Sequence, residues 1–210
     1  MRADYPLVLR LVLPVLLALG LLPGPGAAQA PDDSQGPWTL RIRAVISGTS
    51  HDSEPEGWTI YSGIGLEAAV ARRLGDMAAL ESSLRTESRE VEATGEVPSH
   101  LGSLEVLPLT LLVQWWPRAG GEAEVQPYLG AGLAPTATWE KTGALDSTDV
   151  RPSLDPAVQA GLDWGLSRRT ALNLDVKWNP FTARIRDFAT PDPSVSVDPM
   201  TFGLGLGVRF

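Results

Sequence analysis

The stretch "TFGLGLGVRF", residues 201–210, alternates strictly between two kinds of residue. The apolar positions are Phe202, Leu204, Leu206, Val208 and Phe210. The positions between them are Gly203, Gly205, Gly207 and Arg209. Successive side chains of a β-strand point to opposite faces, so the stretch predicts a strand with one apolar face. Three glycines would weaken such a strand in a soluble sandwich. The rest of the chain must therefore show what solvent the apolar face meets.

The first 28 residues have the pattern of a secretory signal peptide. An apolar run at residues 11–22 is followed by small residues, and Gly26 and Ala28 fit a cleavage site after residue 28. Ala30 allows a cut after residue 30 instead. The apolar run is shorter than the roughly 20 residues that a spanning helix needs, which disfavours a retained anchor. We therefore expect an exported protein.

The composition limits the classes of function. The chain has no cysteine, so it has neither disulfides nor thiol chemistry. It carries 25 acidic and 17 basic residues, and its formal charge is −8. This balance argues against binding to nucleic acid. A single domain fits the mature length, and no second apolar run is long enough to span a membrane as a helix.

Alternating segments recur along the whole mature chain. They occupy residues 38–47, 58–71, 77–87, 104–116, 125–139, 156–166, 172–185 and 201–210. The connections alternate between short turns and long polar loops, the long ones at 48–57, 88–103, 140–155 and 186–197. An even number of strands with short inner turns and long outer loops is typical of bacterial outer-membrane barrels. The sequence predicts an all-β fold, an eight-stranded antiparallel transmembrane β-barrel of outer-membrane type. The barrel spans residues 38–210, after a periplasmic segment at 29–37.

The second face of these strands is rich in glycine and charge. Its charged residues are Arg41, Arg43, Glu67, Asp163, Asp175, Lys177 and Arg209. A soluble lipocalin-like barrel would point its apolar side chains inward instead. We therefore expect these charges to pair with one another inside a narrow lumen. Eight strands leave an interior too narrow for a water-filled porin.

The tryptophans give a separate indication of orientation. The four expected at the inner interface are Trp38, Trp115, Trp116 and Trp164. Trp58 and Trp139 are expected at the outer interface, and Trp178 nearer the middle of its strand. Tryptophan is enriched at both membrane interfaces, whereas core tryptophans would not sort by strand end. This distribution favours a membrane barrel.

The segment at 104–116 differs from the others because its outer half is apolar on both faces. Its predicted inward residues include Leu104, Val106, Pro108 and Leu112. Proline lacks the N–H of a strand ladder, so Pro108 and nearby Pro135 predict a weakened wall. We expect a path for a small apolar solute here. The alternative is that these residues only pack under a loop.

Several of these stretches together resemble the OmpW family of outer-membrane proteins, which includes the AlkL-type hydrocarbon importers. The matching stretches are "LPLTLLVQWW" (107–116), "PYLGAGL" (127–133), "VQAGLDWGL" (158–166), "LNLDVKW" (172–178) and "VDPMTFGLGLGVRF" (197–210). The departure is the segment that begins at residue 77, which is more charged than the family pattern. The resemblance implies a barrel that gives small hydrophobic molecules a path into or across the outer membrane. The terminal Phe210, after alternating apolar residues, looks like the signal read by barrel-assembly machinery. The expected partners are thus outer-membrane lipid, that machinery and a small hydrophobic solute.

No pattern for catalysis, a metal or a cofactor stands out. His51 and His100 are the only histidines, and both fall in predicted outer loops. The stretch "SGTSHDSE" at 47–54 has the residue types of a lipid-modifying barrel enzyme, but such residues are common in loops. We expect no enzyme activity, no catalytic residue, no bound metal and no cofactor. A structural or surface-adhesion protein that acts through its loops remains the main alternative to transport.

Overall fold

The computed structural model describes residues 36–48, 53–54, 58–93, 99–117, 125–141, 149–150, 153–186, 194–197 and 200–210. None of these described residues belongs to a helix long and apolar enough to cross a membrane. The predicted signal peptide at 1–28 lies outside the described residues, as does nearly all of the segment at 29–37. Both therefore stay predictions.

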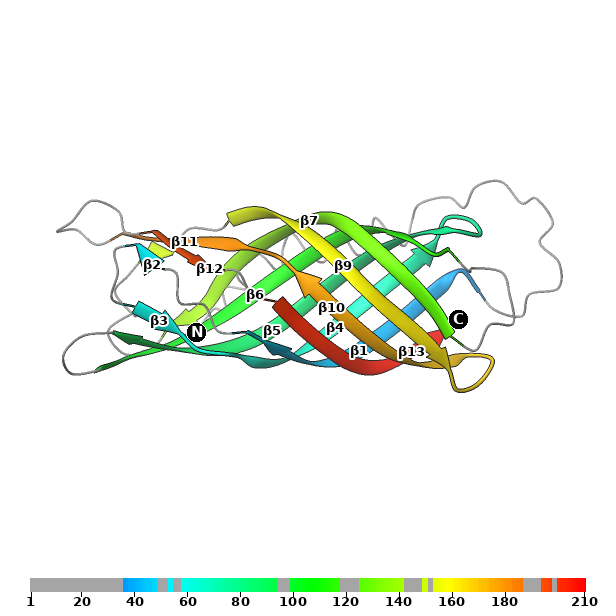
Figure 1. Cartoon of the computed structure of the whole chain (residues 1–210), viewed down its shortest axis with the longest axis horizontal. Coiled ribbons are helices and arrows are strands. Elements are labelled where there is room, and N and C mark those ends of the chain that lie inside the picture. The colour runs from blue at the N-terminus through cyan, green and yellow to red at the C-terminus, as the bar shows by residue number, and fades with distance from the viewer. Residues whose placement is uncertain are drawn as a thin grey trace, which may run out of the picture.

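The described strands form a closed antiparallel barrel (Figure 1). The barrel strands are β1 (Trp38–Ser47), β3 (Trp58–Ile60), β4 (Ile64–Arg73), β5 (Ala78–Ala93), β6 (Ser99–Trp115), β7 (Val125–Lys141), β9 (Ser153–Gly165), β10 (Thr170–Trp178) and β13 (Met200–Arg209). They are ordered β3-β5-β4-β1-β13-β10-β9-β7-β6, and pairing of β5 with β6 closes the ring. Because β3 and β4 are consecutive and both pair with β5, they act as one strand. The described part of the chain thus forms the predicted eight-stranded barrel.

The β5–β6 hairpin is longer than predicted. β5 runs to Ala93 and β6 starts at Ser99, so most of the loop expected at 88–103 is strand. Backbone pairing continues from Ser88↔Glu105 to Ala93↔Ser99, across one register shift. The prediction was wrong here because it relied on apolar alternation, whereas a ladder outside the apolar band needs only backbone hydrogen bonds.

A second, small sheet lies at the end of the barrel opposite the C-terminus (Figure 1). Its strands are β2 (Ser53–Glu54), β12 (Ser194–Val197), β11 (Phe181–Arg186) and β8 (Asp149–Val150), in that order. The strand predicted at 172–185 is divided between β10 and β11, with a break at Asn179 and Pro180. Proline restricts the residue before it and supplies no N–H, which accounts for the break.

The barrel is apolar outside and polar inside. In β1 the burial alternates at every residue, so Ile42 and Ile46 are exposed while Arg41 and Arg43 are buried. In β13 the predicted apolar face is exposed along its whole length, from Phe202 (55% exposed) to Val208 (44% exposed). This arrangement is the reverse of a soluble barrel, so the apolar face of the opening stretch meets lipid.

The first and last strands of the barrel pair along their full length. Their register runs from Thr39↔Arg209 to Ser47↔Thr201. A Cβ added at Gly205 would lie 1.9 Å from the carbonyl oxygen of Ile42, so only glycine allows the two backbones to approach this closely.

The tryptophan prediction holds only in part. Trp115 and Trp164 are exposed on the outer face, at the end of the barrel where the girdle was expected. Trp116 was misplaced, because it is buried and its ring packs on Tyr128 at a centroid distance of 4.7 Å. Adjacent strand residues point to opposite faces, so Trp115 and Trp116 cannot both face lipid. Trp178 is the last residue of β10 and not a mid-strand residue. The side chains of Trp58 and Trp139 lie outside the described part.

Gly161 gives a test of how tightly the interior is packed. A Cβ added at Gly161 would lie 2.4 Å from the ring of Tyr128 and 2.7 Å from the carbonyl oxygen of Leu174. We expect Gly161→Ala to lower the free energy of unfolding by about 1–3 kcal/mol, since such overpacking forces a shift. Urea unfolding in lipid vesicles measures this. Gly207→Ala is the matched control, because its Cβ would come no closer than 3.4 Å to Arg41. Equal unfolding midpoints for the two variants would contradict the prediction.

Candidate functional site

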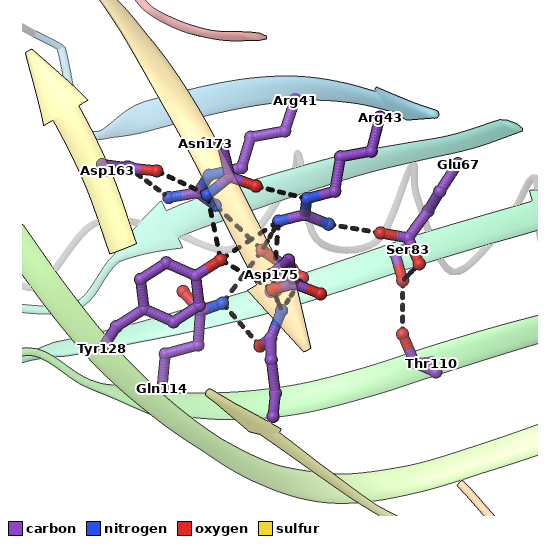
Figure 2. A network of polar contacts seen from close by, with 12 residues as sticks. Arg41, Arg43, Glu67, Ser83, Thr110, Gln114, Tyr128, Asp163, Asn173 and Asp175 are labelled. Atoms are coloured by element: carbon purple, nitrogen blue, oxygen red, sulfur yellow. Dashed lines mark hydrogen bonds and ion pairs between the residues drawn. The ribbon is translucent and has the colours of Figure 1, made fainter. Parts of the chain in front are cut away.

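Polar side chains from most of the barrel strands meet in the middle of the lumen (Figure 2). We call this group the lumen network. Its members are Arg41, Arg43, Glu67, Glu81, Ser83, Thr110, Gln114, Tyr128, Gln159, Asp163, Asn173, Asp175 and Lys177. All are buried, and they fill the barrel from wall to wall.

Glu81 of β5 is the centre of the lumen network. Its side chain is fully buried, and one carboxylate oxygen accepts hydrogen bonds from Arg41 at 2.8 Å and from Arg43 at 3.3 Å. The other oxygen lies 3.5 Å from Lys177 Nζ. Gln159 completes the shell with a bond of 3.0 Å. Three cations thus share one carboxylate, which compensates for its removal from water.

A second carboxylate ties the upper part of the network to the opposite wall. Lys177 Nζ of β10 donates to both oxygens of Glu67 on β4, at 2.8 and 2.7 Å, and Arg43 also donates to Glu67. Lys177 also donates to Ser83 at 3.0 Å. Asp175, two residues before Lys177 on the same face of β10, lies farther from Lys177 Nζ, at 3.9 Å. These contacts link strands that are not neighbours in the barrel.

Asp163 and Asp175 complete the network on its other side. Asp163 accepts from Arg41 at 2.9 Å and from Asn173 at 2.6 Å. Asp175 accepts from the hydroxyl of Tyr128 at 2.7 Å. In Figure 2 the side chains of Asp163 and Asp175 lie close to the guanidinium groups of β1. The result is a cross-linked polar layer rather than separate ion pairs.

Below this layer, aromatic rings narrow the lumen further. Trp116 packs on Tyr128, and the guanidinium carbon of Arg41 lies 5.5 and 5.4 Å from the two ring centroids. Arg73 covers Trp116 at 5.1 Å. Stacked rings capped by cations form a compact floor. We call Trp116, Tyr128 and these two arginines the lower plug.

Six of the seven charged residues expected to face the lumen belong to the network. Arg209 lies lower, half-buried, where it donates to Gln126 at 2.9 Å. Sequence reasoning missed Glu81, the central residue. The signal was available in the sequence, since Leu80 and Leu84 lie on one face of this segment and Glu81 therefore takes the opposite face.

Along β6 the inward wall is apolar except at Thr110, and it begins at the level of the network, where Leu112 pairs with Glu81. Val106, Pro108 and Leu112 of β6 are buried at the inward positions. Leu112 packs with Ala134 and Ala157 in one cluster. Leu104 pairs with Arg89 in the backbone register, but its side chain lies outside the described part.

The adjoining wall is charged, because β5, which pairs with β6, carries charged inward residues that sequence reasoning also missed. β5 presents Arg85, Glu87 and Arg89 on successive inward positions, all buried. Glu87 lies 2.7 Å from Arg89 Nε and 3.2 Å from Arg85 Nε. Ser47 of β1 donates to Glu87 as well. The upper lumen is thus charged along β5 and apolar along the adjoining β6.

The ladders on both sides of β6 are interrupted in this upper half. Between β5 and β6, pairing passes from Leu84↔Leu109 directly to Glu87↔Val106. Between β6 and β7 it passes from Pro108↔Thr136 directly to Leu111↔Leu133. The register is the same on both sides of each interruption. The skipped positions contain Pro108 in the first ladder and Pro135 in the second, and neither has an N–H to donate.

The described residues contain no group of three or more His, Asp or Glu side chains arranged to hold a metal ion. His51 lies outside the described residues. His100 lies in β6, but its side chain also lies outside the described part.

Comparison with known proteins agrees with this geometry. The sequence profile of the OmpW family matches residues 54–210. The chain belongs to the OmpW family. Outer membrane protein AlkL of Ectopseudomonas oleovorans is 35% identical over 88 residues, which cover 40% of this chain and 38% of AlkL. The match thus spans less than half of that relative.

Solved structures show the same fold. OprG from Pseudomonas aeruginosa superimposes with a TM-score of 0.69 at 20% identity, over 84% of this chain and 97% of OprG. AlkL in lipid bilayers gives a TM-score of 0.63 at 20% identity, over 90% of this chain and 97% of AlkL. This OmpW-family chain is therefore a barrel of the bacterial outer membrane.

Glu81→Gln tests the role of the central carboxylate. The amide keeps the shape of the side chain but leaves Arg41, Arg43 and Lys177 with less negative charge, so the free energy of unfolding should fall by about 3–5 kcal/mol. Urea unfolding in lipid vesicles measures the change. Glu90→Gln on the same strand is the control, because Glu90 is exposed and its loss should change stability by less than about 0.5 kcal/mol. Similar effects of the two variants would show that Glu81 is not central.

Proposed function

We propose that this OmpW-family barrel gives small hydrophobic molecules a path into or across the outer membrane, with a sideways exit beside β6. The observation that carries the proposal is the pair of ladder interruptions that flank β6 at Pro108 and Pro135. A wall without those backbone bonds opens at lower cost than a continuous ladder.

The closed floor supports a sideways rather than an axial exit. The lumen network and the lower plug fill the interior below Pro108 of β6 with buried, mutually bonded groups. An apolar solute that passed straight through would have to separate charges at Glu81, which is unfavourable in a low-dielectric interior. A solute that enters from the outer end therefore meets the apolar wall of β6 first and the bilayer beyond it.

The chemistry of that wall suits an apolar solute. Val106 and Pro108 supply hydrocarbon surface at the interruption, and the predicted path also includes Leu104 and Leu112 on the same strand. Membership of a family that includes AlkL-type hydrocarbon importers supports the same class of solute. Thr110, a member of the lumen network, separates Leu112 from the other three residues along the inward face of β6.

Restoring the missing ladder bond should slow uptake. Pro108→Val supplies an N–H at the interruption, so the wall should open less often and uptake of an alkane should fall by about two- to tenfold. Uptake of octane by cells that carry the protein measures the rate. Pro117→Val at the inner turn is the matched control and should leave uptake unchanged. Unchanged uptake in a correctly assembled Pro108→Val barrel would refute the sideways exit.

A charge on the path should block it. Leu112→Asp, and separately Leu104→Asp, place a carboxylate where the solute passes, and uptake should fall by about tenfold or more because the solute would have to desolvate the charge. Leu166→Asp at the exposed inner turn is the control. Heat-dependent gel mobility confirms folding. Normal uptake in all folded variants would favour the alternative, a structural or adhesion protein that acts through its loops.

We also propose that barrel-assembly machinery recognises the outward face of the last strand. The apolar residues on the outward face of β13, and the residue that follows it, are all exposed. They are Phe202, Leu204, Leu206, Val208 and Phe210. Phe210 also exchanges backbone hydrogen bonds with Trp38, at 3.0 and 3.2 Å, and so extends the β1–β13 pairing by one residue.

Deletion of Phe210 should reduce the amount of folded barrel in the outer membrane without reducing export. Quantitative blotting of heat-modifiable protein in membrane fractions measures assembly, and processing of the leader measures export. Phe202→Ala is a useful comparison, because it removes an exposed aromatic side chain from the same face but keeps the terminal residue. Full assembly after the deletion would rule out a role for Phe210.

A further inference from the structure

On the side of the upper lumen formed by β7, β9 and the end of β10, four polar side chains have buried atoms that the fold leaves unbonded. Asn179 is 1% exposed, yet neither its Nδ2 nor its Oδ1 has a hydrogen-bond partner among the described residues. The same holds for Thr136 Oγ1, Ser153 Oγ and Asp155 Oδ2. Unbonded buried polar atoms are rare in native proteins, and each one calls for a specific explanation.

These four side chains belong to one part of the barrel wall. Thr136 of β7 pairs with Ser153 of β9, and Ala134 pairs with Asp155. β9 and β10 are paired up to Val158↔Trp178, so Asn179 follows directly and lies diagonal to Asp155. Alternation along each strand turns all four toward the lumen. We call Thr136, Ser153, Asp155 and Asn179 the polar row.

The polar row adjoins the apolar path on two sides. Thr136 pairs with Pro108, at the interruption of the β6 wall. The buried cluster of Leu112, Ala134 and Ala157 adjoins the row, because Ala134 pairs with Asp155. A molecule held there would therefore meet hydrogen-bonding groups at one end and hydrocarbon at the other.

We propose that the polar row binds the hydroxyl head of an amphiphilic solute such as a medium-chain primary alcohol, while its alkyl chain lies against Leu112 and Pro108. The inference deepens the proposed transport function and rests on it. It assigns to the upper lumen a head-group site in addition to the apolar path.

The unbonded donors and acceptors of the row fit a hydroxyl group better than a carboxylate, an ammonium group or an alkane. Asp155 Oδ2 and Asn179 Oδ1 need a donor, whereas Asn179 Nδ2 needs an acceptor. A hydroxyl group can donate one hydrogen bond and accept another. A carboxylate has no hydrogen to donate and would be repelled by Asp155, and an ammonium group has no lone pair to accept. An alkane supplies neither, and it would displace water from the row without replacing the hydrogen bonds.

Binding of 1-octanol, octane and octanoate to the full barrel in lipid nanodiscs tests the site. The ¹⁵N–¹H signal of the Asn179 side-chain amide reports contact directly, and its assignment follows from its loss in Asn179→Leu. We expect octanol to shift this signal and to bind more tightly than octane or octanoate. Asn179→Leu and Thr136→Val should each weaken octanol binding by about tenfold and leave octane binding unchanged or tighter.

The variants should fold, because the atoms that they remove have no partner among the described residues. Thr86→Val is the matched control, since Thr86 is exposed on the outer face of β5 and its loss should change no affinity. Equal affinity for octanol and octane, or octanol binding that survives both substitutions, would overturn the inference and leave water as the occupant of the row. Failure of the transport proposal gives a different result, which is octane uptake that does not depend on Pro108 or Leu112.

Discussion

Charge neutralisation inside a space only as wide as a few side chains is the constraint on which this barrel depends. Eight strands leave no room for bulk water, so the inward groups must solvate one another. Glu81 satisfies this requirement for Arg41, Arg43 and Lys177 at once. Backbone ladders join each strand only to its neighbours, whereas these ion pairs join opposite walls. The ion pairs therefore fix the distance between opposite strands, and their side chains fill the lumen.

The same constraint separates the lumen into two parts with different properties. In the lower part, long side chains reach across and bond, so the interior is cross-linked. In the upper part, β7 and β9 carry Ala134 and Ala157, which are too short to reach the charges of β5. Polar atoms there remain without partners among the described residues, and the wall at β6 lacks ladder bonds. The two parts thus differ in how far their inward groups bond across the lumen.

The sequence alone predicted the strand bounds and face assignments that depend on local alternation. β1 has the predicted bounds, Trp38–Ser47, and the face assignments of β1 and β13 are correct because lipid on one side and charge on the other impose a period of two. Trp116 was misplaced where that same rule was not applied to two adjacent tryptophans. Glu81 was overlooked because its segment was judged by its weak apolar face.

Other features could not have been predicted from local pattern. Lys177 bonds most closely to Glu67, far away in sequence, and not to its strand neighbour Asp175. Which charged residues meet across the lumen depends on the shear of the barrel, that is, on the register shift with which the strands close the ring. No single strand determines that shift. The small sheet of β2, β12, β11 and β8 likewise joins short stretches from three separate parts of the chain. Two of these strands, β2 and β8, are only two residues long and are therefore too short to show any alternation.

The pairing of β1 with β13 also determines when the barrel can be completed. Every other neighbouring pair of barrel strands is formed by strands that follow one another along the chain, but this seam joins residue 39 to residue 209. Long-range pairing of this kind is slow because the whole intervening chain must be positioned first. Until the seam forms, both edges present unpaired backbone groups beside an apolar exterior, which is the combination most prone to aggregation. The chain is thus most vulnerable immediately before its last two edges meet.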